Sequence, residues 1–90
     1  MTELEKDFEE HTKIIRYLKQ KPEDDELLEL YGLYKQSKLG DCNTGKPWMI
    51  YTTDVSKWNV WDKYKGMTPD ESMRTYIRRV KELSILYGVK

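Results

Sequence analysis

The sequence predicts an all-α protein, a helical bundle that forms one domain. Apolar residues recur at intervals of three and four in four successive segments, which is the pattern of amphipathic helices. Pro22, Gly40, Gly66 and Gly88 separate or end these segments, and proline and glycine are the residues that stop helices. A chain of 90 residues buries only about 60–65% of its unfolded surface, so short helices joined by turns are an economical architecture.

The charge and cysteine content restrict the class of protein. The chain has 16 basic and 16 acidic residues, a formal net charge of zero and a pI near 6.6. It therefore lacks the excess of basic residues that is typical of a nucleic-acid-binding protein. No apolar run approaches the ~18 residues that span a bilayer, so we expect no stable membrane insertion. Cys42 is the only cysteine and the segment MTELEKDFEE lacks the features of a secretory leader. We therefore expect a cytoplasmic location.

The first helix is expected from about Glu5 to Lys19, before Pro22. Its apolar stripe is formed by Leu4, Phe8, His11, Ile15 and Leu18, with Ile14 at the edge. A lone histidine in such a stripe is more often a partly buried residue with one hydrogen bond than a catalyst. Arg16 lies on the flank of the same helix.

The second helix is expected from Asp24 to Leu39, followed by Gly40. On a helical wheel, its core-facing arc contains Leu27, Leu30, Tyr31 and Tyr34. A stripe of Leu28, Tyr31 and Lys35 runs along the edge of this arc. An aliphatic chain, a phenol and a cation side by side suit a ligand with an anionic head and an apolar tail. The alternative interpretation is that the tyrosines belong to the core and the lysine faces solvent.

A connecting loop is expected from Asp41 to Thr53. It is long for a small bundle, so it joins distant helices or walls a ligand groove. A third helix follows from an N-cap at Asp54 and is closed by Gly66. Its apolar residues are Val55, Trp58, Trp61 and Tyr64, and Lys57 precedes the first tryptophan. Tryptophans three residues apart are expected to be buried and to anchor this helix to the bundle.

The fourth helix begins with the clearest boundary signal in the sequence. Thr68 and Glu71 form a predicted capping box with Pro69 at the first helical position, and Gly88 ends the helix. Its expected core face is Met73, Ile77, Val80, Ser84 and Tyr87, with Tyr76 and Leu83 on one shoulder. Ile85 and Leu86 are expected to point away from this face, so the sequence predicts a small exposed apolar patch there.

Three segments of the chain resemble the acyl-CoA-binding protein family: KPEDDELLELYGLYKQSKLGDCNTGKP, KWNVWDKYKGM and TYIRRVKEL. The resemblance covers nearly all the residues and implies a single acyl-CoA-binding domain over residues 1–90. It implies an antiparallel four-helix bundle in up-down-down-up order, with a long loop between the second and third helices. It also implies a non-enzymatic, monomeric carrier of medium- to long-chain fatty acyl-CoA without a cofactor, with acyl-CoA-using enzymes as candidate partners.

The resemblance also implies a binding site. The 3′-phosphate of coenzyme A would be held by Tyr31, Lys35 and Lys57, and the remaining positions would contact the nucleotide and acyl parts. The expected ligand-binding residues are Arg16, Leu28, Tyr31, Tyr34, Lys35, Lys57 and Tyr76. Trp48, Thr53 and Val55 depart from the family pattern and leave the preferred acyl-chain length open.

Two other classes of function were compared with this interpretation. An enzyme would need a nucleophile and a base, and the only candidates are Cys42 and His11, which lie on separate segments without a third residue to orient them. The sequence has no HExxH motif, no zinc-spaced Cys/His cluster and no glycine-rich phosphate loop. A helical protein-interaction module without a small-molecule ligand remains the alternative, with the third helix and the Ile85/Leu86 patch as its surfaces.

Overall fold

The computed structural model describes residues 1–47 and 52–90. The helices are α1 (Glu3–Ile14), the short 3-10 helix η1 (Ile15–Tyr17), α2 (Asp24–Leu39), α3 (Thr52–Lys63) and α4 (Pro69–Tyr87). Within the described residues, β-pairing is limited to one isolated bridge between Leu18 and Val89. The all-α prediction is therefore confirmed, while the departure from the family pattern at Trp48 lies outside the described residues.

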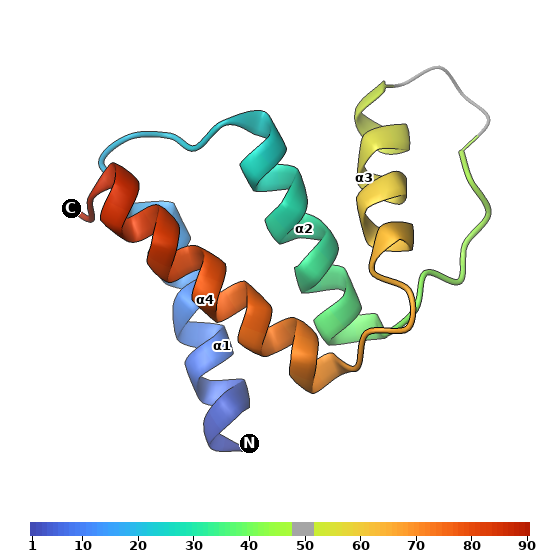
Figure 1. Ribbon diagram of the computed structural model, residues 1–90, viewed down its shortest axis with the longest axis horizontal. Helices are drawn as coiled ribbons and strands as arrows, with labels where there is room; N and C mark the ends of the chain where they lie inside the picture. The colour runs from blue at the N-terminus through green and yellow to red at the C-terminus, as the bar shows by residue number, and fades with distance from the viewer. Residues whose placement is uncertain (48–51) are drawn as a thin grey trace.

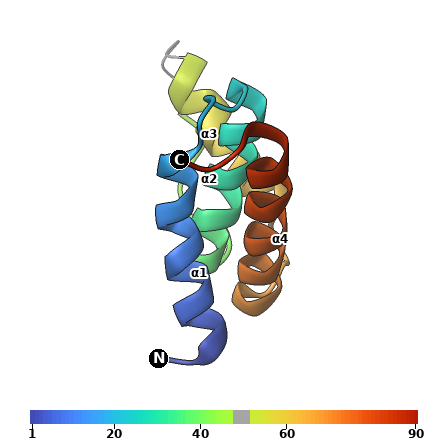
Figure 2. The same cartoon turned by 90° about the vertical axis from the view of Figure 1, so that its left-hand side faces the viewer.

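The four long helices follow the predicted up-down-down-up order (Figure 1). α2 is central, since it packs against α4 and α3, and α1 packs against α4. The molecule is flat, with Cα extents of 39 × 30 × 15 Å, and Figure 2 shows it edge-on. Because the molecule is thin, the residues of α2 that face neither neighbouring helix lie at a broad surface.

The first helix begins and ends earlier than the predicted range of Glu5 to Lys19. Thr2 caps it, since its hydroxyl accepts from the backbone N–H of Glu5 and the Glu5 carboxylate accepts from the N–H of Thr2, both at 3.1 Å. This reciprocal pair satisfies two backbone donors at the helix start. The pair explains why the helix begins at Glu3.

The end of this segment is set by the C-terminus of the chain. Leu18 is extended, and the N–H of Lys19 donates to the carbonyl of Gly88 at 2.8 Å. The N–H of Lys90 donates to the carbonyl of Tyr17, also at 2.8 Å. The predicted helix end at Lys19 is wrong because these backbone groups pair with residues distant in the sequence.

The other boundaries agree with the prediction for α2 and differ from it for α3. The bounds of α2 are confirmed, and Gly40 follows it with a φ of 78°. Asp54 is not an N-cap: α3 begins at Thr52, so Asp54 lies in its first turn. α3 ends at Lys63, and Tyr64 lies in the following turn rather than on the helix.

The start of α4 is confirmed at Pro69, with one difference in its cap. The Thr68 hydroxyl accepts from the N–H of Glu71 at 3.1 Å. The Glu71 carboxylate accepts from that same hydroxyl at 3.0 Å, where a capping box would have it accept from the Thr68 backbone. The predicted hydrogen bond from the Thr68 backbone N–H to the Glu71 carboxylate is therefore replaced by one from the Thr68 hydroxyl.

The hydrophobic core lies between α1, α2 and α4. Its buried residues are Phe8, Leu18, Leu30, Leu33, Met73, Tyr76, Ile77, Val80 and Leu83. Leu33 is 0% exposed whereas Tyr34 is 38% exposed, and Leu27 and Tyr31 are half-buried. The predicted core arc of the second helix is thus wrong except at Leu30, because α2 packs against two helices and its core face turns toward α4.

The predicted core face of α4 is confirmed at Met73, Ile77 and Val80, and it differs from the observed one at its other positions. Tyr76 and Leu83, expected on its shoulder, are buried, and Ser84 and Tyr87 are only half-buried. α4 packs against both α1 and α2, so its buried side is centred between those two helices.

The apolar patch expected near the end of α4 is exposed. Ile85 is 87% exposed and the adjacent Leu86 65% exposed, which confirms that both lie outside the core.

A glycine allows the close approach of α2 and α3. A Cβ atom at Gly32 would lie 2.7 Å from the carbonyl oxygen of Val60 and 3.0 Å from the Tyr64 ring. The same Cβ atom would lie 2.9 Å from the carbonyl carbon of Val60. Since two of these atoms are backbone atoms, any side chain at this position would force the helices apart.

A polar cluster ties the end of α2 to the turn before α4. The Asp41 carboxylate accepts from the N–H of Gly66 at 2.8 Å and from the Gln36 amide at 2.9 Å. The same amide donates to the carbonyl of Met67 at 2.9 Å, and Gln36 is 0% exposed. The two bonds that Asp41 accepts lower the pKa of its carboxyl group; the bond from the Gly66 N–H is the larger cause and the bond from the Gln36 amide the smaller.

Gly32→Ala is expected to lower the free energy of unfolding by about 1–3 kcal/mol, because overpacking outweighs the gain in helix propensity of about 1 kcal/mol. Urea unfolding measures this difference. Gly45→Ala is the control, since a Cβ there meets nothing within 4 Å, and its effect should stay within about 0.5 kcal/mol. Equal stability of the two variants would show that α2 and α3 do not depend on this contact.

Asp41→Asn is expected to make stability less dependent on pH. A carboxyl group whose pKa is lowered by folding stabilises the protein fully above its unfolded pKa of about 4, and this contribution is lost as the pH falls through the folded pKa. The difference in unfolding free energy between wild type and variant should therefore be largest at neutral pH and shrink in acid. Urea unfolding at several pH values tests this, and a constant difference would contradict it.

Candidate functional site

Two lysines from different helices converge on one tyrosine ring. Tyr31 and Lys35 lie one turn apart on α2, and Lys57 lies on α3. The Nζ atoms of Lys57 and Lys35 lie 5.2 Å and 5.9 Å from the centroid of the Tyr31 ring. In the part of the chain that the structure describes, neither lysine forms an ion pair. The site therefore holds two positive charges that a bound anion can neutralise.

The tryptophans of α3 complete the surroundings of Lys35. Its Nζ atom lies 5.2 Å from the centroid of the Trp61 ring. Trp61 is 6% exposed, and its indole N–H donates to the carbonyl of Gly40 at 2.8 Å. Trp58 is only half-buried, and its indole N–H donates to the carbonyl of Thr44 at 2.9 Å. The expectation that both tryptophans are buried is therefore correct for Trp61 and wrong for Trp58.

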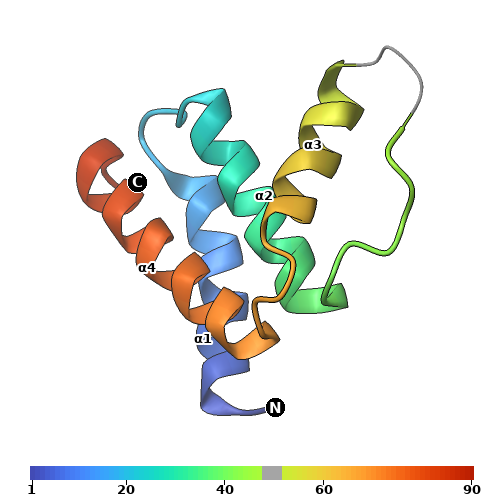
Figure 3. The same ribbon diagram turned by 45° about the vertical axis from the view of Figure 1, so that its right-hand side comes forward.

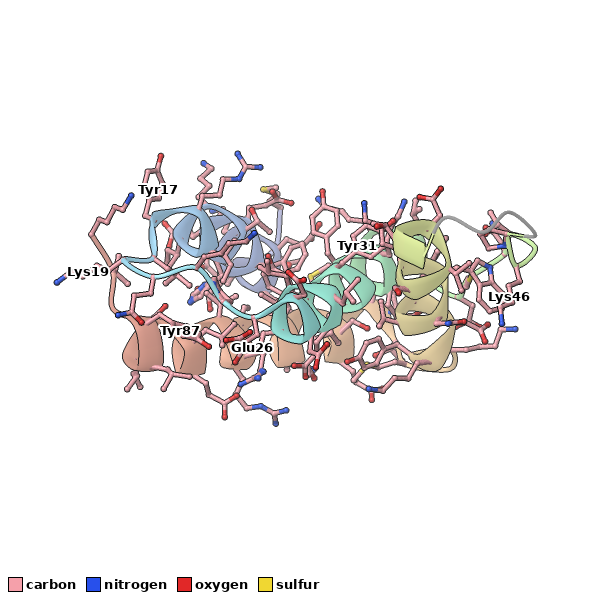
Figure 4. The ribbon with its side chains drawn as sticks, turned by 90° about the horizontal axis from the view of Figure 1, so that it is seen from above. Tyr17, Lys19, Glu26, Tyr31, Lys46 and Tyr87 are labelled. Carbon is pink, nitrogen blue, oxygen red and sulfur yellow. The ribbon has the colours of Figure 1, made fainter. Side chains whose placement is uncertain are left out.

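Two cavities meet at Tyr31 and Lys57, between the neighbouring helices α2 and α3 (Figure 3). The smaller, of about 270 Å³, is lined by Tyr31, Lys35, Thr44, Pro47, Asp54, Lys57, Trp58 and Trp61. The larger, of about 550 Å³, is lined by Asp24, Leu27, Leu28, Tyr31, Thr53, Ser56 and Lys57. The cationic cavity thus adjoins a larger one with two leucines in its wall, and Tyr31, which is labelled in Figure 4, lines both.

The other predicted residues form a second group. Arg16, Tyr34 and Tyr76 line a cavity of about 400 Å³ between α1, α2 and α4, with Glu9, Thr12, Lys13 and Ile15. Tyr34 stacks on the Phe8 ring at 5.9 Å between centroids, and Tyr76 meets that ring edge-on at 5.0 Å. Burial raises the pKa of Tyr76 to about 12. Its hydroxyl, like that of an ordinary tyrosine, is protonated at neutral pH and can donate a hydrogen bond.

The structure divides the predicted site into two groups that share α2. Leu28, Tyr31, Lys35 and Lys57 line the cavities at α3. Tyr34, directly before Lys35, belongs to the group at α1 and α4. Sequence reasoning missed Leu27, Trp58, Thr44 and Pro47 in the first group and Lys13 in the second. Lys13 could have been found, because it precedes Arg16 by three residues and shares its helix face.

The two candidate catalytic residues, His11 and Cys42, are buried. His11 is 7% exposed, and its Nδ1 atom lies 2.8 Å from the carbonyl oxygen of Asp7. The expected hydrogen bond is present, the side chain is more fully buried than the partly buried residue expected, and the Nδ1 atom also lies 3.2 Å from the Asp7 carboxylate. Cys42 is 7% exposed and unbridged. Among residues 1–47 and 52–90, no group of three potential ligands could hold a metal ion, and no helix is long and apolar enough to cross a membrane.

A family model described as acyl CoA binding protein matches residues 5–80. The chain belongs to the acyl-CoA-binding protein family. This confirms the resemblance of the YGLYKQ and KWNVW segments, and membership of a family of non-enzymatic binding proteins supports the expectation that the chain is not an enzyme.

Individual members of the acyl-CoA-binding protein family agree in sequence and fold. An acyl-CoA-binding protein of Brassica napus is 41% identical over 80 residues, which are 89% of this chain and 87% of that protein. The crystal structure of Oryza sativa acyl-CoA-binding protein 2 has a TM-score of 0.87 and 35% identity over 92% of both chains. The solution structure of the Babesia bovis protein has a TM-score of 0.77 and 28% identity over 91% of this chain and 94% of its own. The predicted four-helix bundle is confirmed.

Trp61→Ala is expected to lower the free energy of unfolding by about 3–5 kcal/mol, because its large buried ring leaves a cavity. Trp58→Ala should cost clearly less, since the Trp58 ring is half-exposed and lines the cationic cavity. Chemical unfolding of both variants measures the difference. Trp61→Phe keeps most of the ring volume but removes the indole N–H, so it measures the contribution of the hydrogen bond to the Gly40 carbonyl. Equal losses for the two alanine variants would mean that Trp58 is as much a part of the core as Trp61.

Proposed function

We propose that this protein binds medium- to long-chain fatty acyl-CoA thioesters and acts as an intracellular carrier and pool former. Residues 1–90 would form a single acyl-CoA-binding domain that works as a cytoplasmic monomer and delivers its ligand to acyl-CoA-using enzymes. Family membership and the names of its relatives support acyl-CoA as the ligand. The chain-length range and the anchoring residues are our proposal, taken from the family resemblance and compatible with the lining of the cavities.

The observation that carries the proposal is the pair of ammonium groups against Tyr31. We assign Tyr31, Lys35 and Lys57 to the 3′-phosphate of coenzyme A, because a phosphate can accept from both lysines and from the phenol at once. Hydrogen bonds to a charged group contribute about 1.5–3 kcal/mol each. Without a carboxylate partner in the described structure, these lysines do not have to break an ion pair to bind the ligand.

The acyl chain would lie along the larger cavity, against Leu27 and Leu28. Each methylene buried there contributes about 0.8 kcal/mol, so a medium or long chain contributes as much as the phosphate. Head and tail together exceed an association cost of at least ~4 kcal/mol by enough for sub-micromolar affinity. Free fatty acid lacks the head group, and short acyl-CoA lacks the tail, so both should bind weakly.

The second group of residues would contact the rest of the ligand. Arg16 offers a guanidinium group, which suits phosphate oxygens. Tyr34 offers a partly exposed ring as well as a hydroxyl, and the protonated hydroxyl of Tyr76 can donate a hydrogen bond. We assign these three residues to the nucleotide and acyl contacts outside the 3′-phosphate site.

Calorimetry with palmitoyl-CoA, its 3′-dephospho analogue and palmitate tests the assignment. The analogue is expected to bind about 2–4 kcal/mol more weakly, the value of one or two lost charge-assisted bonds, and palmitate should hardly bind. Lys35→Ala should remove much of the difference between the two CoA esters, because the phosphate then lacks one of its partners.

Lys65→Ala is the matched control. This lysine is exposed in the turn after α3 and lines none of the three cavities, so its loss should leave the difference between the esters unchanged. The phosphate-anchored mechanism is wrong if palmitate binds as well as palmitoyl-CoA. It is equally wrong if Lys35→Ala weakens both esters by the same factor.

A further inference from the structure

The cavity that we assign to the 3′-phosphate contains a carboxylate as well as two cations. The charged residues in its lining are Lys35, Lys57 and Asp54. Asp54 lies in the first turn of α3 and is exposed. It precedes Lys57 by three residues, so the two side chains project from the same side of the helix. A negative charge therefore borders the space in which the phosphate is proposed to bind.

The Asp54 carboxylate is not paired with the lysines of this cavity. In residues 1–47 and 52–90, no ion pair joins Asp54 to Lys35, Lys57 or another cation. Lys46 lies against the Trp58 ring, with its Nζ atom 6.0 Å from the ring centroid, and does not line the cavity. Two lysines and one aspartate give the lining a formal charge of +1. A bound phosphate would meet attraction from two sides and repulsion from a third.

We propose that Asp54 is a selectivity residue that limits the affinity of this site for the 3′-phosphate. The inference rests on the proposed function, since it takes the phosphate to bind between Lys35 and Lys57. A phosphate monoester carries about two negative charges at neutral pH, so it repels a carboxylate in the same cavity. A sphere with the cavity's volume of about 270 Å³ is about 8 Å across. Repulsion over about 8 Å of water lowers the affinity on the order of five-fold.

A divalent cation that bridged Asp54 and the phosphate would reverse the sign of this effect. Mg²⁺ is usually held by one or two carboxylates together with phosphate oxygens of the ligand. The lining of this cavity supplies one carboxylate and two ammonium groups, and the ammonium groups repel a cation. The lining therefore favours direct repulsion between Asp54 and the phosphate over a bridged contact.

The effect of Asp54 on the ligand is separable from its effect on the helix. A carboxylate in the first turn stabilises a helix through the macrodipole, and Asp70 has the same position in α4. Stabilising α3 changes the affinity for every ligand of the site alike. Repulsion acts only on a ligand that places a phosphate in the cavity. The ratio of the affinities for two ligands that differ in this phosphate therefore measures the repulsion alone.

Calorimetry at low salt with palmitoyl-CoA and its 3′-dephospho analogue tests the inference on the full chain. Asp54→Asn should bind palmitoyl-CoA on the order of five-fold more tightly than wild type and the analogue with unchanged affinity. Asp54→Glu retains the charge and should retain the wild-type ratio of the two affinities. The gain in Asp54→Asn should shrink as the salt concentration is raised, because ions screen exposed charges.

Asp70→Asn is the matched control. Asp70 is also exposed in the first turn of a helix, and it lines none of the three cavities described above. The control removes the same charge from the protein and should leave both affinities unchanged. Circular dichroism checks that each variant is folded.

Three results would overturn the inference while leaving the proposed function intact. In the first, wild type prefers palmitoyl-CoA to its analogue, but Asp54→Asn does not increase this preference. In the second, Asp54→Glu increases the preference as much as Asp54→Asn does. In the third, Mg²⁺ strengthens binding of palmitoyl-CoA to wild type and not to Asp54→Asn. A wild type that binds both esters equally would instead refute the phosphate assignment itself, and this inference with it.

Discussion

The contact between α2 and α3 at Gly32 is the constraint on which the candidate site depends. A helix made only of larger residues would hold its neighbour farther away, and the carbonyl of Val60 occupies the space that a side chain would need. Tyr31 precedes this glycine and Lys35 follows it within one turn, so both are carried to the helix pair at its closest point. The approach of Lys57 to the Tyr31 ring follows from this packing.

The rest of the bundle keeps this helix pair in place. α2 is fixed to α4 through the core and through the bonds of Arg79 to Glu26 and Glu29. At its far end, the buried Gln36 and the carboxylate of Asp41 bind the turn between α3 and α4. The proposed binding groups therefore project from packed helices, which is the arrangement that holds a site in a fixed geometry.

Local signals predicted the helices well, and contacts between distant segments explain the differences. The bounds of α2 and the start of α4 are encoded by nearby caps. The end of the first helical segment is set by Gly88, far along the sequence, so no local pattern at Lys19 reveals it. A helical wheel cannot show that α2 has two partners, and so it placed Tyr34 in the core in place of Leu33. Tyr31, Lys35 and Lys57 were identified through the resemblance, but their convergence required the fold.

The backbone pairing of residues 17–19 with residues 88–90 joins the connection between α1 and α2 to the end of α4. A terminal helix usually frays independently, since nothing beyond it is disturbed when its last turn opens. Here the last turn of α4 leads directly into the segment that holds Leu18 and Lys19. Opening at the C-terminus therefore also releases the connection between α1 and α2. This end of the bundle is one cooperative unit, and a disturbance at the last residues is transmitted to the first helix.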